Sequence, residues 1–208
     1  MTATAERSLK PLTDDEKGRI NSGIASMTEA QRVKLLRSLQ PRLVPEYYMH
    51  TPHPKQQVFL SLKVREAMFG GAAGGGKSDA LIMAALQYVD VPGYSALILR
   101  RKWPDLNGTG AILDRTRQWL INTNAQIREG GRRWTFPSGA RITFGTLLHE
   151  NDKYNYQSSE YQFVAWDELT HFPRETDYEY LFSRIRRPQL ICLNCGAPTA
   201  RTPGLKQW

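Results

Sequence analysis

The chain has little cysteine and no long apolar segment. Only two of its 208 residues are cysteines, and they lie too close together in the sequence to cross-link a fold. No apolar run approaches the ~20 residues of a membrane-spanning helix, and the N-terminal stretch MTATAERSLK lacks the apolar core of a signal peptide. We therefore expect a protein of a reducing, cytosolic setting with no membrane partner.

The two cysteines, Cys192 and Cys195, are separated by two residues, which is the spacing of half a zinc site. Tetrahedral zinc needs four ligands, and all four histidines of the chain precede Cys192. Free cysteines are the favoured interpretation. A zinc site stays open only if a second pair of ligands lies beyond the end of this sequence.

Hydrophobic residues make up 40% of the chain, which is enough for one substantial core, so we expect one main domain with appended segments. Lys and Arg outnumber Asp and Glu, 28 against 20, and give a formal net charge of +8. A charge of this sign and size favours a polyanionic partner such as nucleic acid. A solvated basic surface without such a partner is the alternative.

Residues 1–50 differ from the rest and predict an N-terminal helical region followed by a linker. Two threonines are each followed three residues later by Glu or Gln, the signature of a capping box that starts a helix. The pairs are Thr13 with Glu16 and Thr28 with Gln31. The proline-rich stretch QPRLVPEYYMHTPHP is typical of a linker. We place the main domain at residues 51–208.

From Gln56 onward, short apolar runs alternate with helical patterns. This predicts an α/β fold with a mainly parallel sheet covered by helices on both faces. Strands are expected at EAMF, SALILR, YQFVAW and QLICL, and helices at KSDALIMAALQYV, ILDRTRQWLINT and ETDYEYLFSRI. The stretch RRWTFPSGARITFGTLL breaks the pattern, because two alternating runs flank Pro137-Ser138-Gly139. We expect a β-hairpin insertion there.

Five glycines stand between Gly70 and Gly76, after a predicted strand and before a predicted helix. Gly71 and the triplet Gly76-Lys77-Ser78 match G-x-x-x-x-G-K-[ST], the phosphate-binding P-loop. Bare backbone lets consecutive N–H groups surround a phosphate, and the helix that follows favours the anion. Lys77 is expected to reach the β- and γ-phosphates, and the Ser78 hydroxyl to bind Mg²⁺. A flexible glycine turn with a chance GKS triplet is the alternative.

The residues expected to contact the nucleotide in this segment are Gly71, Ala72, Ala73, Gly74, Gly75, Gly76, Lys77, Ser78 and Asp79.

The apolar stretch FVAWDE predicts a buried strand that ends in two acids, Asp167 and Glu168. Because α/β sheets bind ligands at the carboxyl ends of their strands, Asp167 is expected to hold Mg²⁺ through its water shell. Glu168 is placed to act as the general base on the attacking water. A glutamate here is typical of water-activating ATPases and argues against GTPases and small-molecule kinases. The alternative is a strand that simply ends in surface acids.

Together these motifs predict a P-loop NTPase of the ASCE, RecA-like class that binds ATP with Mg²⁺. The P-loop itself contains no arginine, so an arginine finger for the γ-phosphate must come from elsewhere, often from a neighbouring subunit. Arg101, next to Arg100 at the end of SALILRR, is the predicted finger. The other candidates are Arg100, Arg132, Arg133, Arg141, Arg184, Arg186 and Arg187.

Arginines that do not serve as the finger are expected to contact DNA phosphates without sequence preference. For each of them, a solvated charge or a structural ion pair is the alternative.

The sequence resembles the large subunits of bacteriophage terminases, the ATPases that package DNA into viral proheads. Four stretches carry the resemblance in one order: PHPKQQVFL, FGGAAGGGKS, SALILRRKWPDL, and FVAWDELTHF with YLFSRIRRP. They extend from about residue 50 to residue 188. The first resembles the family's adenine-binding glutamine motif, which implies that Gln56 binds adenine. The second resembles its Walker A motif and the last its Walker B region.

The resemblance implies a motor domain that couples ATP hydrolysis to translocation of double-stranded DNA into a prohead. The implied partners are double-stranded DNA, the portal protein, the terminase small subunit and further copies in a ring on the portal. The implied location is the host cytoplasm, transiently at the portal. The family's nuclease domain and its coupling motif after Walker B are not recognisable, so we expect no nuclease activity from this chain.

Two alternatives stay open. One is a nucleotide-binding, DNA-associated assembly module that does not translocate, and the other is a helicase-like ATPase.

Overall fold

A computed structural model of the chain describes residues 13–32, 44–62, 64–72, 74–186, 190–191 and 198–199. The chain divides into two units, Met1–Gln40 and Pro41–Trp208. The sequence places this boundary at residue 50. Cys192 and Cys195 lie outside the described residues, so both interpretations of this pair stay open.

The smaller unit contains the helix α1 (Asp14–Ala25). Its predicted capping box is present, because Thr13 N donates to Glu16 Oε2 at 2.8 Å and Glu16 N donates to Thr13 Oγ1 at 3.3 Å. The second predicted capping box is also present, with Thr28 N donating to Gln31 Oε1 at 2.9 Å. Residues 29–32 are helical, and the rest of that predicted helix lies outside the described residues.

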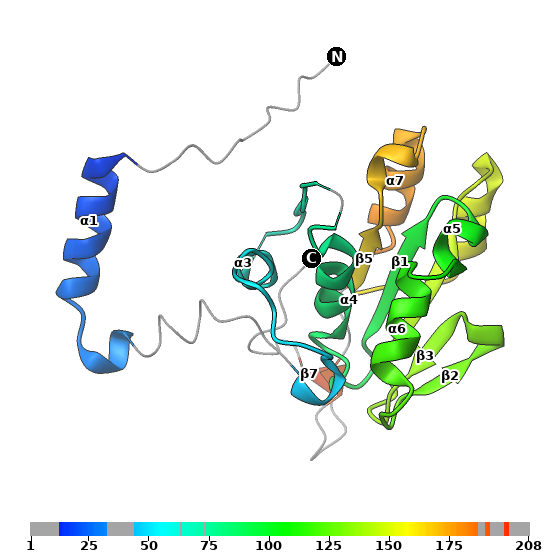
Figure 1. The fold of residues 1–208 in the computed structure, drawn as a ribbon, viewed down its shortest axis with the longest axis horizontal. Helices are drawn as coiled ribbons and strands as arrows, with labels where there is room; N and C mark the ends of the chain where they lie inside the picture. The colour runs from blue at the N-terminus through cyan, green and yellow to red at the C-terminus, as the bar shows by residue number, and fades with distance from the viewer. Residues whose placement is uncertain are drawn as a thin grey trace. The chain divides into compact units, whose positions relative to one another are not determined.

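The larger unit has the α/β composition that the sequence predicts. Its elements are, in chain order, η1 (Pro45–Tyr47), α3 (Pro54–Ser61), α4 (Lys77–Leu86), β1 (Ser95–Arg100), α5 (Trp103–Asn107), α6 (Ile112–Leu120), β2 (Gln126–Arg128), η2 (Glu129–Gly131), β3 (Arg133–Thr135), β4 (Arg141–Thr146), η3 (Glu150–Tyr156), β5 (Phe163–Trp166), η4 (Leu169–His171), α7 (Glu175–Phe182), β6 (Leu190–Ile191) and β7 (Pro198–Thr199). Figure 1 shows their arrangement.

The main sheet has five strands in the order β2-β3-β4-β1-β5. Strand β1 pairs in parallel with both β4 and β5, whereas β3 pairs antiparallel with β2 and β4. The sheet is therefore mixed rather than mainly parallel. The predicted hairpin around Pro137–Gly139 is present as β3 and β4, but it is not an insertion. Its second strand lies beside β1 and contributes the buried residues Ile142 and Phe144 to the core.

Two of the predicted strands differ in the structure. Residues 66–69, the stretch EAMF before the glycines, form no strand, and Met68 is 78% exposed. This segment is held instead by side chains on α7. Tyr178 Oη donates to Glu66 Oε2 at 3.2 Å, and the Arg65 guanidinium lies 4.9 Å from the Phe182 ring centre. In QLICL only Leu190–Ile191 is described, and it pairs with β7 in a separate two-stranded sheet.

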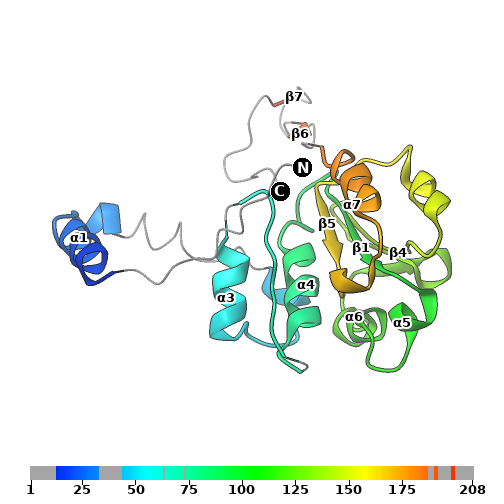
Figure 2. The ribbon, with the colours of Figure 1, turned by 90° about the horizontal axis from the view of Figure 1, so that it is seen from above.

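Helices cover both faces of the main sheet, as predicted. The alternation along β1 sends Ala96 and Ile98 into a core shared with α4 and α6. Leu97 and Leu99 enter a second cluster with Leu181 of α7. Figure 2 shows α4 and α6 on one side of the strands and α7 on the other. This packing places the N-terminus of α4 near the carboxyl end of β5.

The described residues of the expected linker belong to the larger unit and pack into its core. Tyr47 is 3% exposed, and its hydroxyl donates to Asn124 Oδ1 at 2.7 Å. Tyr48 Oη donates to the Met83 carbonyl at 2.7 Å, and burial raises the pKa of Tyr48 above its usual value. In the described part of the chain, no helix has the length and apolar character needed to cross a membrane.

Candidate functional site

The glycine-rich segment leads directly into α4. Gly76 is the N-cap residue of this helix, with φ 71° and ψ 24°, and Gly74 also has a positive φ of 76°. These are left-handed conformations that glycine adopts at little cost. The loop therefore ends where the free N–H groups of a helix begin, which is a geometry suited to an anion. Ala73 lies outside the described residues.

The Lys77 side chain folds back over this loop. Its Nζ donates to the carbonyl oxygens of Gly71 at 3.0 Å and Ala72 at 2.7 Å. The ammonium group thus lies beside the loop backbone, and its contact with the β- and γ-phosphates stays a prediction. These two contacts are to carbonyl groups only, so the charge has no acidic partner among the described residues.

The side chains of Ser78, in the first turn of α4, and Asp167, just after β5, lie next to each other. They are 89 positions apart in the sequence, and Ser78 Oγ lies 3.4 Å from Asp167 Oδ1. Asp167 follows β5 directly, and its N–H donates to the Leu99 carbonyl of β1 at 2.9 Å. The residue is 4% exposed. Burial raises the pKa of its carboxyl above the usual value, and the Arg100 guanidinium partly opposes this increase.

The pairing of a hydroxyl with one buried carboxylate fits Mg²⁺. This ion prefers oxygen ligands and is usually bound by one or two protein groups together with water and phosphate oxygens. Within the described residues there is no group of three or more His, Cys, Asp or Glu side chains that could form an all-protein metal site. Ser78 and Asp167 are the residues that would hold the ion.

Arg100, rather than Arg101, contacts the two acids. Its Nη1 lies 2.7 Å from Asp167 Oδ2, and its Nη2 lies 2.8 Å from Glu168 Oε2. The guanidinium therefore bridges both carboxylates. Arg101 makes no hydrogen bond or ion pair with any described residue, and its Nε atom is buried without a partner. The finger role of Arg101 stays a prediction.

Glu168 has an unusual backbone, with φ 55°. A left-handed conformation is uncommon for a residue with a side chain and costs about 1–2 kcal/mol. Here it turns the chain sharply after Asp167. The Glu168 carboxylate receives a second contact, because His171 Nδ1 lies 3.0 Å from Oε2. His171 stands three residues after Glu168, at the end of the short helical turn η4, and the sequence prediction missed this contact.

Gln56 lies at the same end of α4, but its amide is engaged by the protein. The residue is 2% exposed. Its Nε2 donates to the Gly76 carbonyl at 2.9 Å, and its Oε1 accepts from His53 N at 2.8 Å. Gln56 thus joins α3 to the N-cap of α4. Direct contact of this amide with adenine stays a prediction.

Asp79, the last residue predicted to contact the nucleotide, pairs with neighbouring elements. Its Oδ1 lies 2.9 Å from Arg115 Nη1 of α6, and its Oδ2 lies 3.7 Å from His50 Nε2. The His50 ring also packs edge-on against Trp119, with 5.4 Å between ring centres. The side chain of Asp79 therefore anchors the first turn of α4, and only its backbone is free to face a ligand.

The hydrogen bond from Gln56 Nε2 to the Gly76 carbonyl leads to a first prediction. A Cβ atom at Gly76 would lie 2.7 Å from Gln56 Nε2, and it would also have to adopt a positive φ. We expect Gly76→Ala to lower the melting temperature by about 2–8 °C, since the left-handed conformation alone costs roughly 1–2 kcal/mol. Thermal unfolding measures this effect.

Gly70→Ala is the matched control, because a Cβ at Gly70 meets nothing within 4 Å and needs no positive φ. Equal melting temperatures for the two variants would contradict the assigned geometry of the loop.

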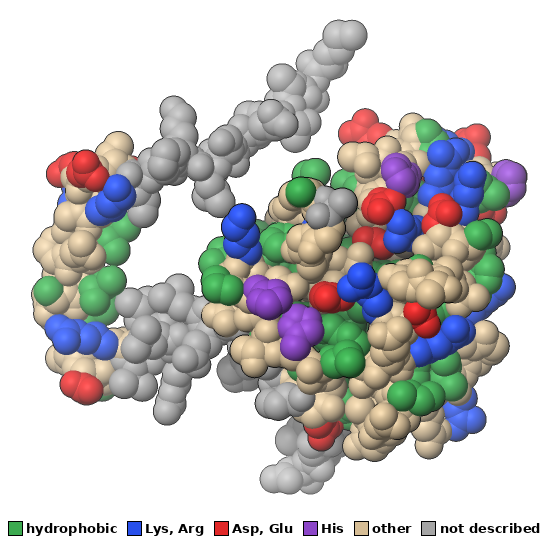
Figure 3. All heavy atoms as spheres, in the orientation of Figure 1, with side chains coloured by type: hydrophobic (Ala, Val, Ile, Leu, Met, Phe, Trp, Pro, Cys, Tyr) green, Lys and Arg blue, Asp and Glu red, His purple; other side chains and the backbone are tan. Residues whose placement is uncertain are grey.

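Basic side chains are scattered over the visible face of the larger unit and alternate with acidic ones (Figure 3). Comparisons of the chain with models of known protein families, with curated proteins and with solved structures find no match.

Proposed function

We propose that the larger unit binds ATP with Mg²⁺ and hydrolyses it, as the motor domain of a viral DNA-packaging terminase. The observation that carries this proposal is the proximity of the Ser78 hydroxyl to the Asp167 carboxylate, directly after the glycine-rich loop. A hydroxyl after a P-loop lysine and an acid at the end of a buried strand are the two protein groups that a P-loop NTPase uses for its metal.

The residues of the chain divide the chemistry between them. The loop backbone from Gly71 to Gly76 and the Lys77 ammonium bind the phosphates. Ser78 and Asp167 would hold Mg²⁺, which supplies charge neutralisation at the phosphate oxygens. Glu168 takes the proton from the attacking water, since a carboxylate next to the metal ligand is within reach of that water. Arg100 keeps Asp167 and Glu168 in fixed positions through its two contacts.

The function in packaging rests on the resemblance to terminase large subunits. It includes coupling of hydrolysis to translocation of double-stranded DNA, assembly as a ring on the portal protein and interaction with the small subunit. The net charge of +8 supports the polyanionic partner. The scattered distribution of basic groups is compatible with contacts to DNA phosphates at several separate points.

A nucleotide-binding module without hydrolysis is the second candidate. It is favoured by the two contacts that the Glu168 carboxylate makes with Arg100 and His171. Both contacts are made to Oε2, so this oxygen cannot take the proton of the attacking water until Arg100 and His171 release it. Measuring ATP turnover with and without double-stranded DNA separates the two candidates.

Lys77→Ala tests the nucleotide site itself. Removing the ammonium takes away charge-assisted hydrogen bonds to the phosphates, each worth about 1.5–3 kcal/mol. We expect ATP affinity to fall by about tenfold or more and hydrolysis to be lost. Titration with a fluorescent ATP analogue and a phosphate-release assay measure the two effects.

Lys55→Ala, which removes an exposed lysine from α3, is the matched control and is expected to retain affinity. Unchanged turnover in Lys77→Ala would overturn the P-loop assignment.

A further inference from the structure

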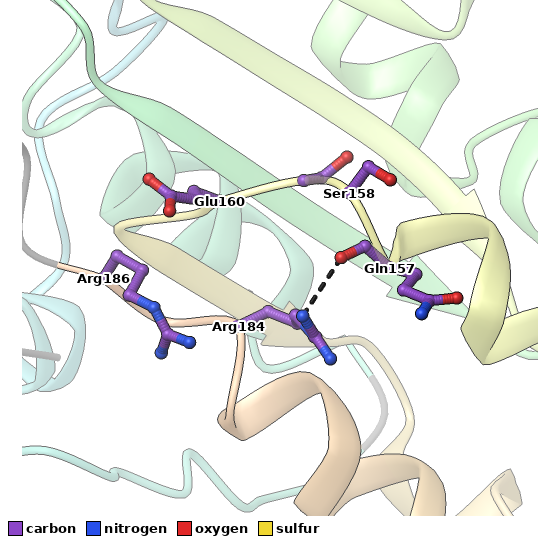
Figure 4. Close-up of a pocket in the computed structure, with 6 residues that line it drawn as sticks. Gln157, Ser158, Glu160, Arg184 and Arg186 are labelled. Atoms are coloured by element: carbon purple, nitrogen blue, oxygen red, sulfur yellow. Dashed lines mark hydrogen bonds between the residues drawn. The ribbon is translucent and has the colours of Figure 1, made fainter.

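A polar hollow lies at the opposite end of β5 from Asp167. Its volume is about 110 Å³, and it is lined by Gln157, Ser158, Ser159, Glu160, Arg184 and Arg186. Figure 4 shows these residues on two segments, the loop before β5 and the chain that leaves α7. Tyr161 and Asp167 stand at the two ends of β5, and extended chain of this length spans about 20 Å. The hollow is therefore separate from the candidate nucleotide site.

The backbone directs the side chains of Arg184 and Arg186 to the same face of their segment, which lines the hollow. Tyr161 forms a parallel bridge with Ile185, with Tyr161 N donating to the Arg184 carbonyl at 3.2 Å and Arg186 N donating to the Tyr161 carbonyl at 2.8 Å. The segment is thus extended, and residues two apart in an extended segment point to the same face. Figure 4 shows both guanidinium groups on that side.

Arg184 is held in position with most of its donors unused. Its guanidinium lies 4.7 Å from the Tyr180 ring centre, and its Nη1 donates to the Gln157 carbonyl at 3.0 Å. Its Nε is buried without a hydrogen-bond partner. Among the described residues, Arg186 donates only to the backbone carbonyls of Ser183 and Ile185. Neither arginine forms an ion pair with an acid in the described part of the chain.

We propose that this hollow binds a phosphate oxyanion, either a backbone phosphate of nucleic acid or a free phosphate. Two unpaired guanidinium groups present several N–H donors in a fixed arrangement that matches phosphate oxygens. The hydroxyls of Ser158 and Ser159 add neutral donors, and no apolar side chain lines the hollow. Glu160 is the one acid present, and its carboxylate points away from the guanidinium groups (Figure 4).

The first arm of the test uses a double-stranded oligonucleotide of arbitrary sequence and the full chain. Arg184→Gln and Arg186→Gln are each expected to weaken binding about tenfold. Each is also expected to reduce the slope of log affinity against log salt concentration by about 0.9. Fluorescence anisotropy over a salt series measures both quantities. Arg19→Gln is the matched control, because it removes the same charge from α1, where Arg19 is paired with Asp15.

The second arm uses inorganic phosphate and follows backbone amide shifts of residues 157–160 by NMR. Shifts that are present in the wild type and lost in Arg186→Gln, with oligonucleotide binding unchanged, assign the site to free phosphate.

Binding of a fluorescent ATP analogue is expected to be equal in all variants, so failure of the proposed ATPase function would leave this result intact. Arg186 is exposed, and its hydrogen bonds to described residues are all to nearby backbone carbonyls. Arg186→Gln is therefore the variant expected to keep the wild-type melting temperature. If that folded variant binds both the oligonucleotide and phosphate as the wild type does, the proposal is wrong.

Discussion

Replacing Glu168 by glutamine is expected to reduce ATP hydrolysis by ~10²–10⁴-fold, the usual contribution of a general base. An amide cannot accept the proton of the attacking water. Binding of ATP with Mg²⁺ is expected to persist, because Ser78 and Asp167 are unchanged. The amide oxygen can also still accept from Arg100 Nη2, which lies 2.8 Å from the native carboxylate. The expected product is a protein that retains unhydrolysed ATP.

Two measurements check this result. Single-turnover phosphate release gives the rate, and chromatography of the nucleotide that stays bound distinguishes ATP from ADP. Glu150→Gln, at an exposed carboxylate at the start of η3, is the control and is expected to hydrolyse at the wild-type rate. Turnover by Glu168→Gln within a few-fold of wild type would mean that another group is the base.

The position of the candidate site was predictable because two local signals coincide with simple features of the fold. The glycines before Lys77 leave the backbone free to adopt positive φ angles, and the helix pattern after it sets the start of α4. The apolar run before Asp167 sets the end of β5. Parallel packing of β5 beside β1 then brings the acid to the sheet edge where α4 begins.

The details of side-chain contact were not predictable from these patterns. Arg100 and Arg101 are adjacent basic residues, and the one that faces the acids depends on the twist and exact end of β1. The backbone of Glu168 turns with a positive φ, and this turn brings its carboxylate to both Arg100 and His171. A single sequence carries no signal for that conformation, because glutamate rarely adopts it.

The failure of EAMF to form a strand has a different cause. An apolar run is compatible with a strand only when a neighbouring strand can satisfy its backbone groups. In the described part of the chain, β5 pairs only with β1, so its other edge is open, but residues 66–69 do not pair with it. The segment 65–69 is held by contacts of Arg65 and Glu66 with α7. Short-range periodicity does not reveal such long-range competition between pairing and side-chain contact.

The isolated chain is expected to be a poor ATPase that becomes active on assembly. The proposed site has Lys77, two residues proposed to bind the metal and a proposed base, while Arg100 is already engaged with the acids of its own chain. Arg101 makes no ion pair with a described residue and is thus available to a neighbour. Where it has been measured, an arginine finger contributes ~10³–10⁵ in rate. Specific activity is therefore expected to rise with protein concentration, and Arg101→Ala is expected to abolish this rise while ATP affinity stays nearly unchanged.

Mixing two inactive variants shows whether the arginine finger is supplied by a neighbouring subunit or by the same chain as the base. Arg101→Ala retains its base, and Glu168→Gln retains its finger. A mixed ring therefore contains complete sites in which the first variant supplies Glu168 and the second supplies Arg101.

Arg100→Gln is the matched control, since Arg100 contacts Asp167 and Glu168 of the same chain. Mixed with Glu168→Gln it leaves no site with both residues, so activity stays absent. Recovery in the first mixture and none in the second is the expected outcome of a coupled ATPase assay. Equal absence of recovery in both mixtures, with specific activity independent of concentration, would mean that Arg101 is not a finger for its neighbour.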